Sequence, residues 1–100
     1  MIQHTVAFRL KYPAGSTEER DFLRSAEALS TIPSVRNFKC LRQIGKKNNF
    51  TFGLTMDFMS AEDYDAYAGH PLHEKFVQER WIPEVAEFIE IDYSPYTETD

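Results

Sequence analysis

The sequence has few of the residues that mark secreted, membrane-spanning or nucleotide-binding proteins. It holds one cysteine and four glycines in 100 residues. A single thiol, Cys40, forms no internal disulfide and suits a reducing compartment, so we expect a cytoplasmic protein. No apolar run approaches the roughly 18 residues of a membrane span. The N-terminal segment also lacks the basic start and long apolar stretch of a signal peptide, so we expect no membrane partner.

Basic charge is scarce as well. Eleven Lys and Arg residues stand against sixteen Asp and Glu residues, which gives a net charge of −5. Nucleic-acid binding needs clustered positive charge, and the one dense basic spot, Lys46-Lys47, lies in a predicted turn. A glycine-rich phosphate loop and a GxSxG nucleophile motif are both missing from the sequence. The sequence therefore argues against nucleic-acid, nucleotide and dinucleotide binding.

What the chain does have is alternation between apolar and polar residues in four segments, as in half-buried strands. These segments are residues 2–10, 35–44, 50–58 and 88–93. The third is the clearest, with one apolar side made of Phe50, Phe52, Leu54, Met56 and Phe58. The turn-forming residues 45–49 between the second and third segments predict a hairpin.

Helix starts are marked by a serine followed three residues later by an acidic residue, at Ser16–Glu19 and at Ser60–Asp63. The first helix should end before Pro33, because the residue preceding a proline disfavours helical geometry. A further helix should open at Pro71, because proline is favoured at the first helical position. The predicted order is β-α-β-β-α-β.

This order predicts an α+β protein of the ferredoxin-like, split βαβ type, with an antiparallel four-stranded sheet and its helices on one face. We expect a single domain over residues 1–100. Eight Phe, five Tyr and one Trp predict a core packed with large side chains. The uncovered face should be more polar, and it suits either water or a second sheet. Its predicted residues are Thr5, Arg9, Thr51, Gly53, Thr55, Asp57, Glu90 and Asp92.

The chain's three histidines, His4, His70 and His73, together with Tyr67, are the best candidates for a functional pocket. If Pro71 is the first helical residue, His70 is the N-cap and His73 lies in the first turn. The positive end of the helix would then disfavour protonation of His73, and a neutral imidazole is what a general base needs. The alternative is that these histidines only cap and pack, with His4 a hydrogen-bonded core residue.

A metal site is a second alternative, because three histidines can hold zinc and leave one position open. However, His70 and His73 straddle a proline, and no cysteine or carboxylate clearly joins them. We therefore expect neither a metal nor another cofactor.

Three segments together resemble the stress-responsive A/B-barrel (Dabb) family. They are the first strand with His4, the stretch His70-Pro71-x-His73-x-x-Phe76, and the closing strand at residues 88–93. The resemblance covers essentially the whole chain. It implies a ferredoxin-like fold whose protomers pair through their sheet faces into a homodimeric α+β barrel.

The family includes a plant polyketide cyclase, and the resemblance implies roles for its matching positions in this chain. His73 would be the general base, Tyr67 would orient His73 or a substrate oxygen, and His4 would polarise a carbonyl. His70 and Phe76 complete the motif as candidate binding residues, and a structural role is an equal alternative for His70.

Three functions remain open at this point. The first is a cofactor-independent lyase or cyclase that uses acid–base chemistry on a small carbonyl or polyketide-like compound. The second is a noncatalytic, stress-responsive or ligand-binding dimer. The third is the chemistry of other dimeric α+β barrels, which include cofactor-free monooxygenases and haem-degrading enzymes, although nothing specific in the sequence selects it.

Overall fold

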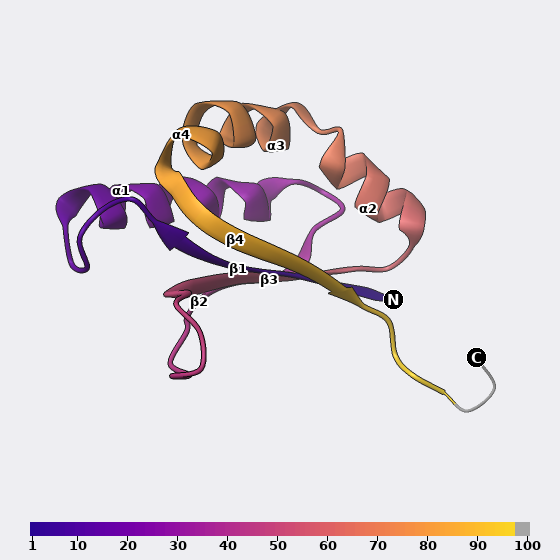
Figure 1. Cartoon of the computed structure of the whole chain (residues 1–100). Helices are drawn as coiled ribbons and strands as arrows, with labels where there is room; N and C mark the ends of the chain where they lie inside the picture. Colours follow the sequence, from indigo (N-terminus) through magenta and orange to yellow (C-terminus); the bar gives the residue numbers. More distant parts are fainter. Residues whose placement is uncertain (98–100) are drawn as a thin grey trace.

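The structure, a computed structural model, describes residues 1–97 and confirms the ferredoxin-like α+β fold (Figure 1). Helices cover one face of a four-stranded antiparallel sheet with the strand order β2-β3-β1-β4. The strands are β1 (Ile2–Leu10), β2 (Arg36–Arg42), β3 (Phe52–Phe58) and β4 (Val85–Tyr93). The helices are α1 (Thr17–Ala26), the 3₁₀ helix η1 (Glu27–Thr31), α2 (Ala61–Ala68), α3 (Pro71–Phe76), the π-helical turn η2 (Val77–Trp81) and α4 (Ile82–Glu84). Within residues 1–97, no helix combines the length and apolar character needed to cross a bilayer.

Both serine caps form as predicted. The Ser16 hydroxyl accepts a hydrogen bond from the Glu19 backbone N–H at 3.2 Å, and the Ser60 hydroxyl accepts one from the Asp63 N–H at 3.1 Å. Each bond satisfies one of the backbone donors that a helix start leaves without a partner. After α1 the chain tightens into η1, which ends at Thr31, before Pro33.

The helical segment after Pro71 widens before it ends. The Ile82 N–H donates to the Val77 carbonyl, five residues back rather than four. Pro83 explains this widening, because it has no N–H and its ring crowds the carbonyl four residues earlier. The chain then enters β4 at Val85, three residues before the predicted start at Phe88.

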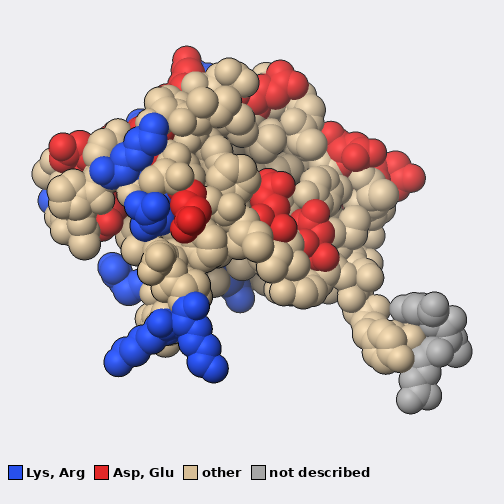
Figure 2. All heavy atoms as spheres, in the orientation of Figure 1, with Lys and Arg blue, Asp and Glu red and all other residues tan. Residues whose placement is uncertain are grey.

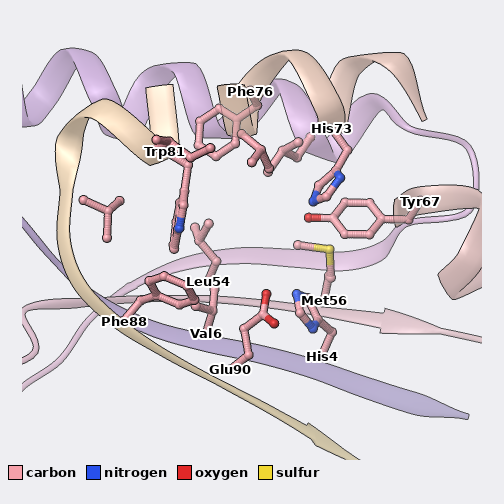
Figure 3. A pocket seen from close by; sticks show the side chains of 14 residues that line it. His4, Val6, Leu54, Met56, Tyr67, His73, Phe76, Trp81, Phe88 and Glu90 are labelled. Atoms are coloured by element: carbon pink, nitrogen blue, oxygen red, sulfur yellow. The ribbon is translucent and has the colours of Figure 1, made fainter. Parts of the chain in front are cut away.

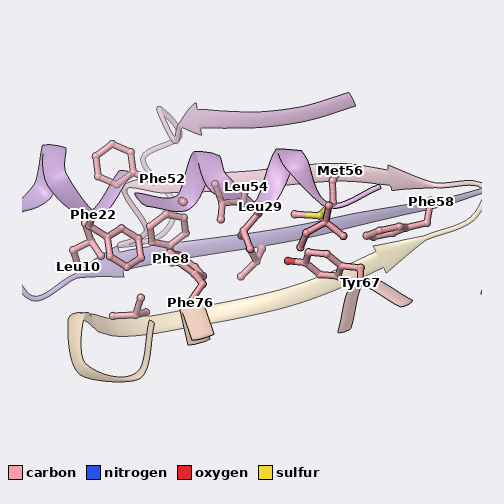
Figure 4. Close-up of a cluster of buried hydrophobic side chains, with 14 residues drawn as sticks. Phe8, Leu10, Phe22, Leu29, Phe52, Leu54, Met56, Phe58, Tyr67 and Phe76 are labelled. Carbon is pink, nitrogen blue, oxygen red and sulfur yellow. The ribbon is translucent and has the colours of Figure 1, made fainter. Parts of the chain in front are cut away.

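The core lies between the sheet and the helices (Figure 4). Aromatic rings dominate it, with the rings of Phe8 and Phe22 centred 5.8 Å apart and those of Phe22 and Phe76 5.5 Å apart. The largest fully buried side chains are Phe8, Phe22, Phe58, Leu29, Ile32, Leu54 and Met56. The predicted large-residue core is confirmed, and it ties β1, β3 and α1 into a rigid base.

The predicted orientation of β4 is wrong. Val6 pairs with Glu90 and His4 pairs with Asp92 across the β1–β4 ladder. Residues directly opposite one another in neighbouring strands project to the same face. Glu90 and Asp92 therefore lie on the helix-covered face, together with Phe88. The alternation in this segment correctly shows which residues share a side, but the register with β1 decides which side is covered.

The apolar residues of β4 consequently lie on the open face. Ile89, Ile91 and Tyr93 are 47%, 42% and 52% exposed. The β1–β3 register places the predicted open-face residues of those strands as expected, since Thr5 pairs with Thr55 and Ala7 with Gly53. The open face is thus polar along its middle strands and apolar along β4.

Candidate functional site

A cavity of about 530 Å³ lies between the sheet and the segment from α2 to α4 (Figure 3). This size falls within the usual range for small-molecule sites. One end is polar and the other is apolar and aromatic. The polar side chains are His4, Tyr67, His73 and Glu90, and the apolar walls include Val6, Leu54, Phe76, Trp81 and Phe88. The structure thus brings three of the sequence-predicted residues, His4, Tyr67 and His73, to one end of a single cavity.

The imidazole of His73 is held in one tautomer. Its Nδ1 lies 3.0 Å from the backbone carbonyl oxygen of Ala68. A carbonyl oxygen only accepts hydrogen bonds, so Nδ1 carries the proton and Nε2 keeps its lone pair. Burial is the largest influence on this group and lowers the pKa of His73 from its ordinary value, against the weaker opposing effect of the Ala68 carbonyl. His73 is therefore neutral at pH 7.

The lowered pKa of His73 agrees with the prediction from its place at a helix start, but burial is the main cause. The His-Pro-x-His stretch places the residue. Pro71 is the first residue of α3, and the His70 Nδ1 accepts a hydrogen bond from the Leu72 N–H at 3.1 Å. His70 is thus the N-cap, as predicted, and it lies outside the cavity lining. This cap fixes the start of α3. In the first turn of α3, the side chain of His73 then reaches back to the carbonyl oxygen of Ala68, the last residue of α2.

Tyr67 sits against His73, with ring centres 4.5 Å apart, and its ring centre is 6.0 Å from that of His4. Burial raises the pKa of the Tyr67 hydroxyl above its ordinary value, so the group stays protonated. Its oxygen points into the cavity in Figure 3, and within residues 1–97 it has no hydrogen-bond partner. The hydroxyl is therefore free to donate to an oxygen of a ligand.

His4 belongs to a hydrogen-bonded cluster at the mouth of the polar end. Its Nδ1 lies 2.6 Å from Asp92 Oδ1 and 3.0 Å from the Tyr64 hydroxyl, which in turn donates to Asp92 Oδ2 at 2.9 Å. A carboxylate only accepts, so the His4 Nδ1 carries a proton and donates it to Asp92. In both histidines of the cavity, Nδ1 therefore carries a proton and lies against an oxygen acceptor.

Sequence reasoning missed Tyr64, Asp92 and Glu90. Asp92 and Glu90 were assigned to the other face of the sheet, and only the β1–β4 register places them beside His4 and Val6. Tyr64 lies three residues before Tyr67 on α2, so helical spacing alone would have placed both tyrosines on similar sides. Nothing in the local sequence marks Tyr64 as a partner of the first strand.

Trp81 and Phe88 form the wall at the apolar end, with ring centres 5.4 Å apart and nearly perpendicular planes. A polar network fixes the turn that carries Trp81. Arg80 bonds Asp21 of α1 at 2.8 Å and Glu84 of α4 at 2.5 Å. These ion pairs hold the backbone of the widened turn, from which the side chain of Trp81 points into the cavity. Within residues 1–97, no group of three or more His, Cys, Asp or Glu side chains is placed to hold a metal ion.

Residues 2–95 match the family described as the stress responsive A/B barrel domain, Dabb. The chain belongs to this family. It is also 30% identical over 95 residues to a stress-response A/B barrel domain-containing protein of Arabidopsis thaliana, a match that covers 93% of this chain and 36% of that protein. The chain thus spans little more than a third of the length of this plant relative.

Among solved structures, a Dabb family protein with a ferredoxin-like fold from Mesorhizobium loti is 46% identical, with a TM-score of 0.95 over 96% of this chain and 97% of that one. A hydroxynitrile lyase from Passiflora edulis superposes with a TM-score of 0.78 over 92% of this chain and 90% of that one, at 17% identity. At that identity the likeness shows the fold alone.

Proposed function

We propose that this Dabb protein is a homodimer whose cavity performs cofactor-independent acid–base chemistry on a small carbonyl or polyketide-like compound. One observation carries the proposal. The neutral imidazole of His73, whose Nε2 makes no hydrogen bond within residues 1–97, lies against the ring of Tyr67, whose hydroxyl is protonated, inside a ligand-sized cavity. This pair supplies a base and a hydrogen-bond donor without any other group.

The chemistry that fits is removal of a proton from the carbon next to a carbonyl. The His73 Nε2 takes the proton, and the electron pair of the C–H bond moves onto the carbonyl oxygen to give an enolate. The Tyr67 hydroxyl donates a hydrogen bond to that oxygen, and His4 contributes to the polarity around it. The enolate carbon then either attacks a second carbonyl of the same molecule, as in a cyclase, or takes the proton back from His73 itself. In the attack, the oxygen of the second carbonyl takes the electron pair of its π bond and the proton from His73.

The remaining motif residues have supporting roles in this proposal. The ring of Phe76 forms part of the apolar wall and would contact the carbon skeleton of a ligand. His70 would position His73 through the helix cap rather than touch the ligand. The fold's occurrence in a hydroxynitrile lyase supports a lyase as one outcome. A cyclase is suggested by the motif positions His4, Tyr67 and His73, which resemble those of a plant polyketide cyclase.

The dimer is proposed to form through the open sheet faces. One row of paired residues runs across all four strands from Leu41 through Gly53 and Ala7 to Ile89. The two large residues at its ends are 45% and 47% exposed, and the two central residues are small enough to let another sheet approach. An exposed apolar face of this kind is typical of a surface that a second copy covers.

Hydrogen exchange tests the acid–base proposal without knowledge of the natural substrate. The protein is incubated in D₂O with methyl ketones from acetone to 2-acetonaphthone, and loss of the α-proton signals is followed by NMR. We expect exchange above the buffer rate, and a loss of about a hundredfold or more in His73→Asn, in the range that general-base catalysis contributes.

The matched control is His70→Asn, which makes the same exchange of side chains at the other histidine of the motif. Asparagine is a good N-cap residue, so this variant should lose less than about threefold. Exchange no faster than in buffer, or equal losses in the two variants, would contradict the acid–base proposal. A cavity that bound ketones without exchanging their protons would instead indicate the alternative, a noncatalytic ligand-binding dimer.

A further inference from the structure

Glu90 contributes the carboxylate of the cavity. It lies on β4, on the helix-covered face, and Figure 3 shows its side chain directed into the cavity beside His4. No lysine or arginine is among the residues that line this cavity. Burial favours the neutral form of His73, the Nδ1 of His4 is hydrogen-bonded to Asp92, and no lysine or arginine of the lining balances the charge of Glu90.

The carboxylate of Glu90 is also without a partner in the part of the chain that the structure describes. It makes no hydrogen bond and no ion pair within residues 1–97. Asp92, two residues further along the same side of the same strand, is by contrast engaged by both His4 and Tyr64. Acidic side chains lie along β4, whereas basic ones lie around the β2–β3 hairpin and at the left-hand end of the view, near the start of β4 (Figure 2).

We propose that Glu90 is a specificity-determining residue that excludes anionic ligands, so that the cavity accepts uncharged carbonyl compounds such as ketones, aldehydes and esters but not free carboxylates. This inference rests on the proposed function and names its substrate class. Glu90 is itself exposed to solvent, but a carboxylate ligand bound between the apolar walls would lie next to it, where charges are screened less than in bulk water. An uncharged ketone of the same shape meets no such repulsion.

Two near-isosteric probes separate charge from shape. 2-Acetonaphthone is an uncharged methyl ketone, and 2-naphthoate carries a carboxylate in the same place. Their dissociation constants are measured by NMR or calorimetric titration against the wild type and Glu90→Gln. We expect the wild type to favour the ketone by at least about tenfold, the ratio that roughly 1.4 kcal/mol of repulsion produces. Glu90→Gln should tighten naphthoate binding by about tenfold and leave ketone binding within about twofold.

Glu87→Gln is the matched control, because it removes the same charge from the same strand. Glu87 pairs with Arg9, on the open face, and does not line the cavity. This variant should leave both affinities within about twofold of the wild type, because Glu87 lies on the opposite face of the sheet from the cavity. A carboxylate also loses hydration on entering an apolar cavity, so the wild type would favour the ketone even without repulsion from Glu90. The change in naphthoate affinity between wild type and Glu90→Gln, compared with that in Glu87→Gln, is therefore the test of the repulsion.

Two results would overturn the inference. One is equal tightening of naphthoate binding in Glu87→Gln and Glu90→Gln, which would reduce the effect to net charge. The other is unchanged naphthoate binding in Glu90→Gln. Either leaves the proposed function standing, because the ketone still binds. Failure of both probes to bind any of the three proteins would instead overturn the proposed pocket, and with it this inference.

Discussion

The two sides of β4 contrast sharply. The side that faces the helices carries Phe88, Glu90 and Asp92, and the open side carries Ile89, Ile91 and Tyr93. The usual rule puts apolar residues on the covered side and charged ones on the open side, and β4 departs from it at these positions with the exception of Phe88. Its neighbour in the fold, β3, obeys the rule, because Phe52, Leu54, Met56 and Phe58 are all buried under the helices.

We infer from the difference between these strands that β4 serves the proposed cavity and interface, whereas β3 serves the core of the chain. β3 lies inside the sheet and over the core, whereas β4 is an edge strand that closes the cavity on one side. Charged groups on its covered side are either paired, as Asp92 is, or exposed to the cavity, as Glu90 is. Apolar groups on its open side are proposed to meet a second copy. The residues of β4 that depart from the usual apolar-inside, charged-outside pattern therefore coincide with the proposed ligand cavity and the proposed dimer interface.

The largest expected effect comes from a substitution on the open side of β4, which should weaken the dimer. Ile91→Lys places a charge in the middle of the proposed interface, and we expect the dissociation constant of the dimer to rise by at least about a hundredfold, as for a buried unpaired charge. Sedimentation velocity at several concentrations measures it.

The control for this substitution is Leu72→Lys, which makes a comparable change on α3. Leu72 is 40% exposed, close to the 42% of Ile91, but it lies in the helix layer. It should leave the dimer intact. A dimer that tolerates Ile91→Lys but not Leu72→Lys would place the interface on the helices instead.

A second prediction compares the paired and the unpaired carboxylate on the covered side. Asp92→Asn weakens the hydrogen bonds to His4 and Tyr64, and because Asp92 is partly exposed we expect a cost of about 1–2 kcal/mol in the free energy of unfolding. Glu90→Gln should change it by less than about 0.5 kcal/mol, as at a site without partners. Urea denaturation of both variants checks the difference, and equal costs would mean that Glu90 has a structural partner.

The smallest effect concerns pH. Deuterium exchange should fall on the acid side with a midpoint below 6.5, because burial lowers the pKa of His73 and only its neutral form acts as the base. The negative charge of Glu90 acts in the opposite direction, so Glu90→Gln should move this midpoint further down. Rate profiles between pH 4.5 and 8, about two pH units to either side of the ordinary histidine pKa, test both statements. A midpoint above 6.5 would mean that the base is a different group.

Sequence patterns were sufficient for the element order and both serine caps, because these depend on residues close together in the chain. They were also sufficient for the His70 cap that sets up His73. The orientation of β4 was not predictable, since alternation is symmetric with respect to the two faces and only pairing with β1 breaks that symmetry. The same pairing brings Asp92 to His4 across 88 residues of chain, and the position of α2 over the sheet brings Tyr64 to it across 60 residues. The cavity residues most dependent on register were the ones that local patterns missed.

The central claim is that His73 presents an unprotonated Nε2 to a carbonyl ligand. Long-range ¹H–¹⁵N correlation spectra of the histidine rings test it directly, with 2-acetonaphthone added to the labelled protein at pH 7. We predict that His73 carries its proton on Nδ1 and that its Nε2 resonance moves on addition of the ketone, while the resonances of His70 stay in place. A His73 ring protonated on Nε2, or a ketone that shifts His70 and leaves His73 unchanged, would contradict the claim.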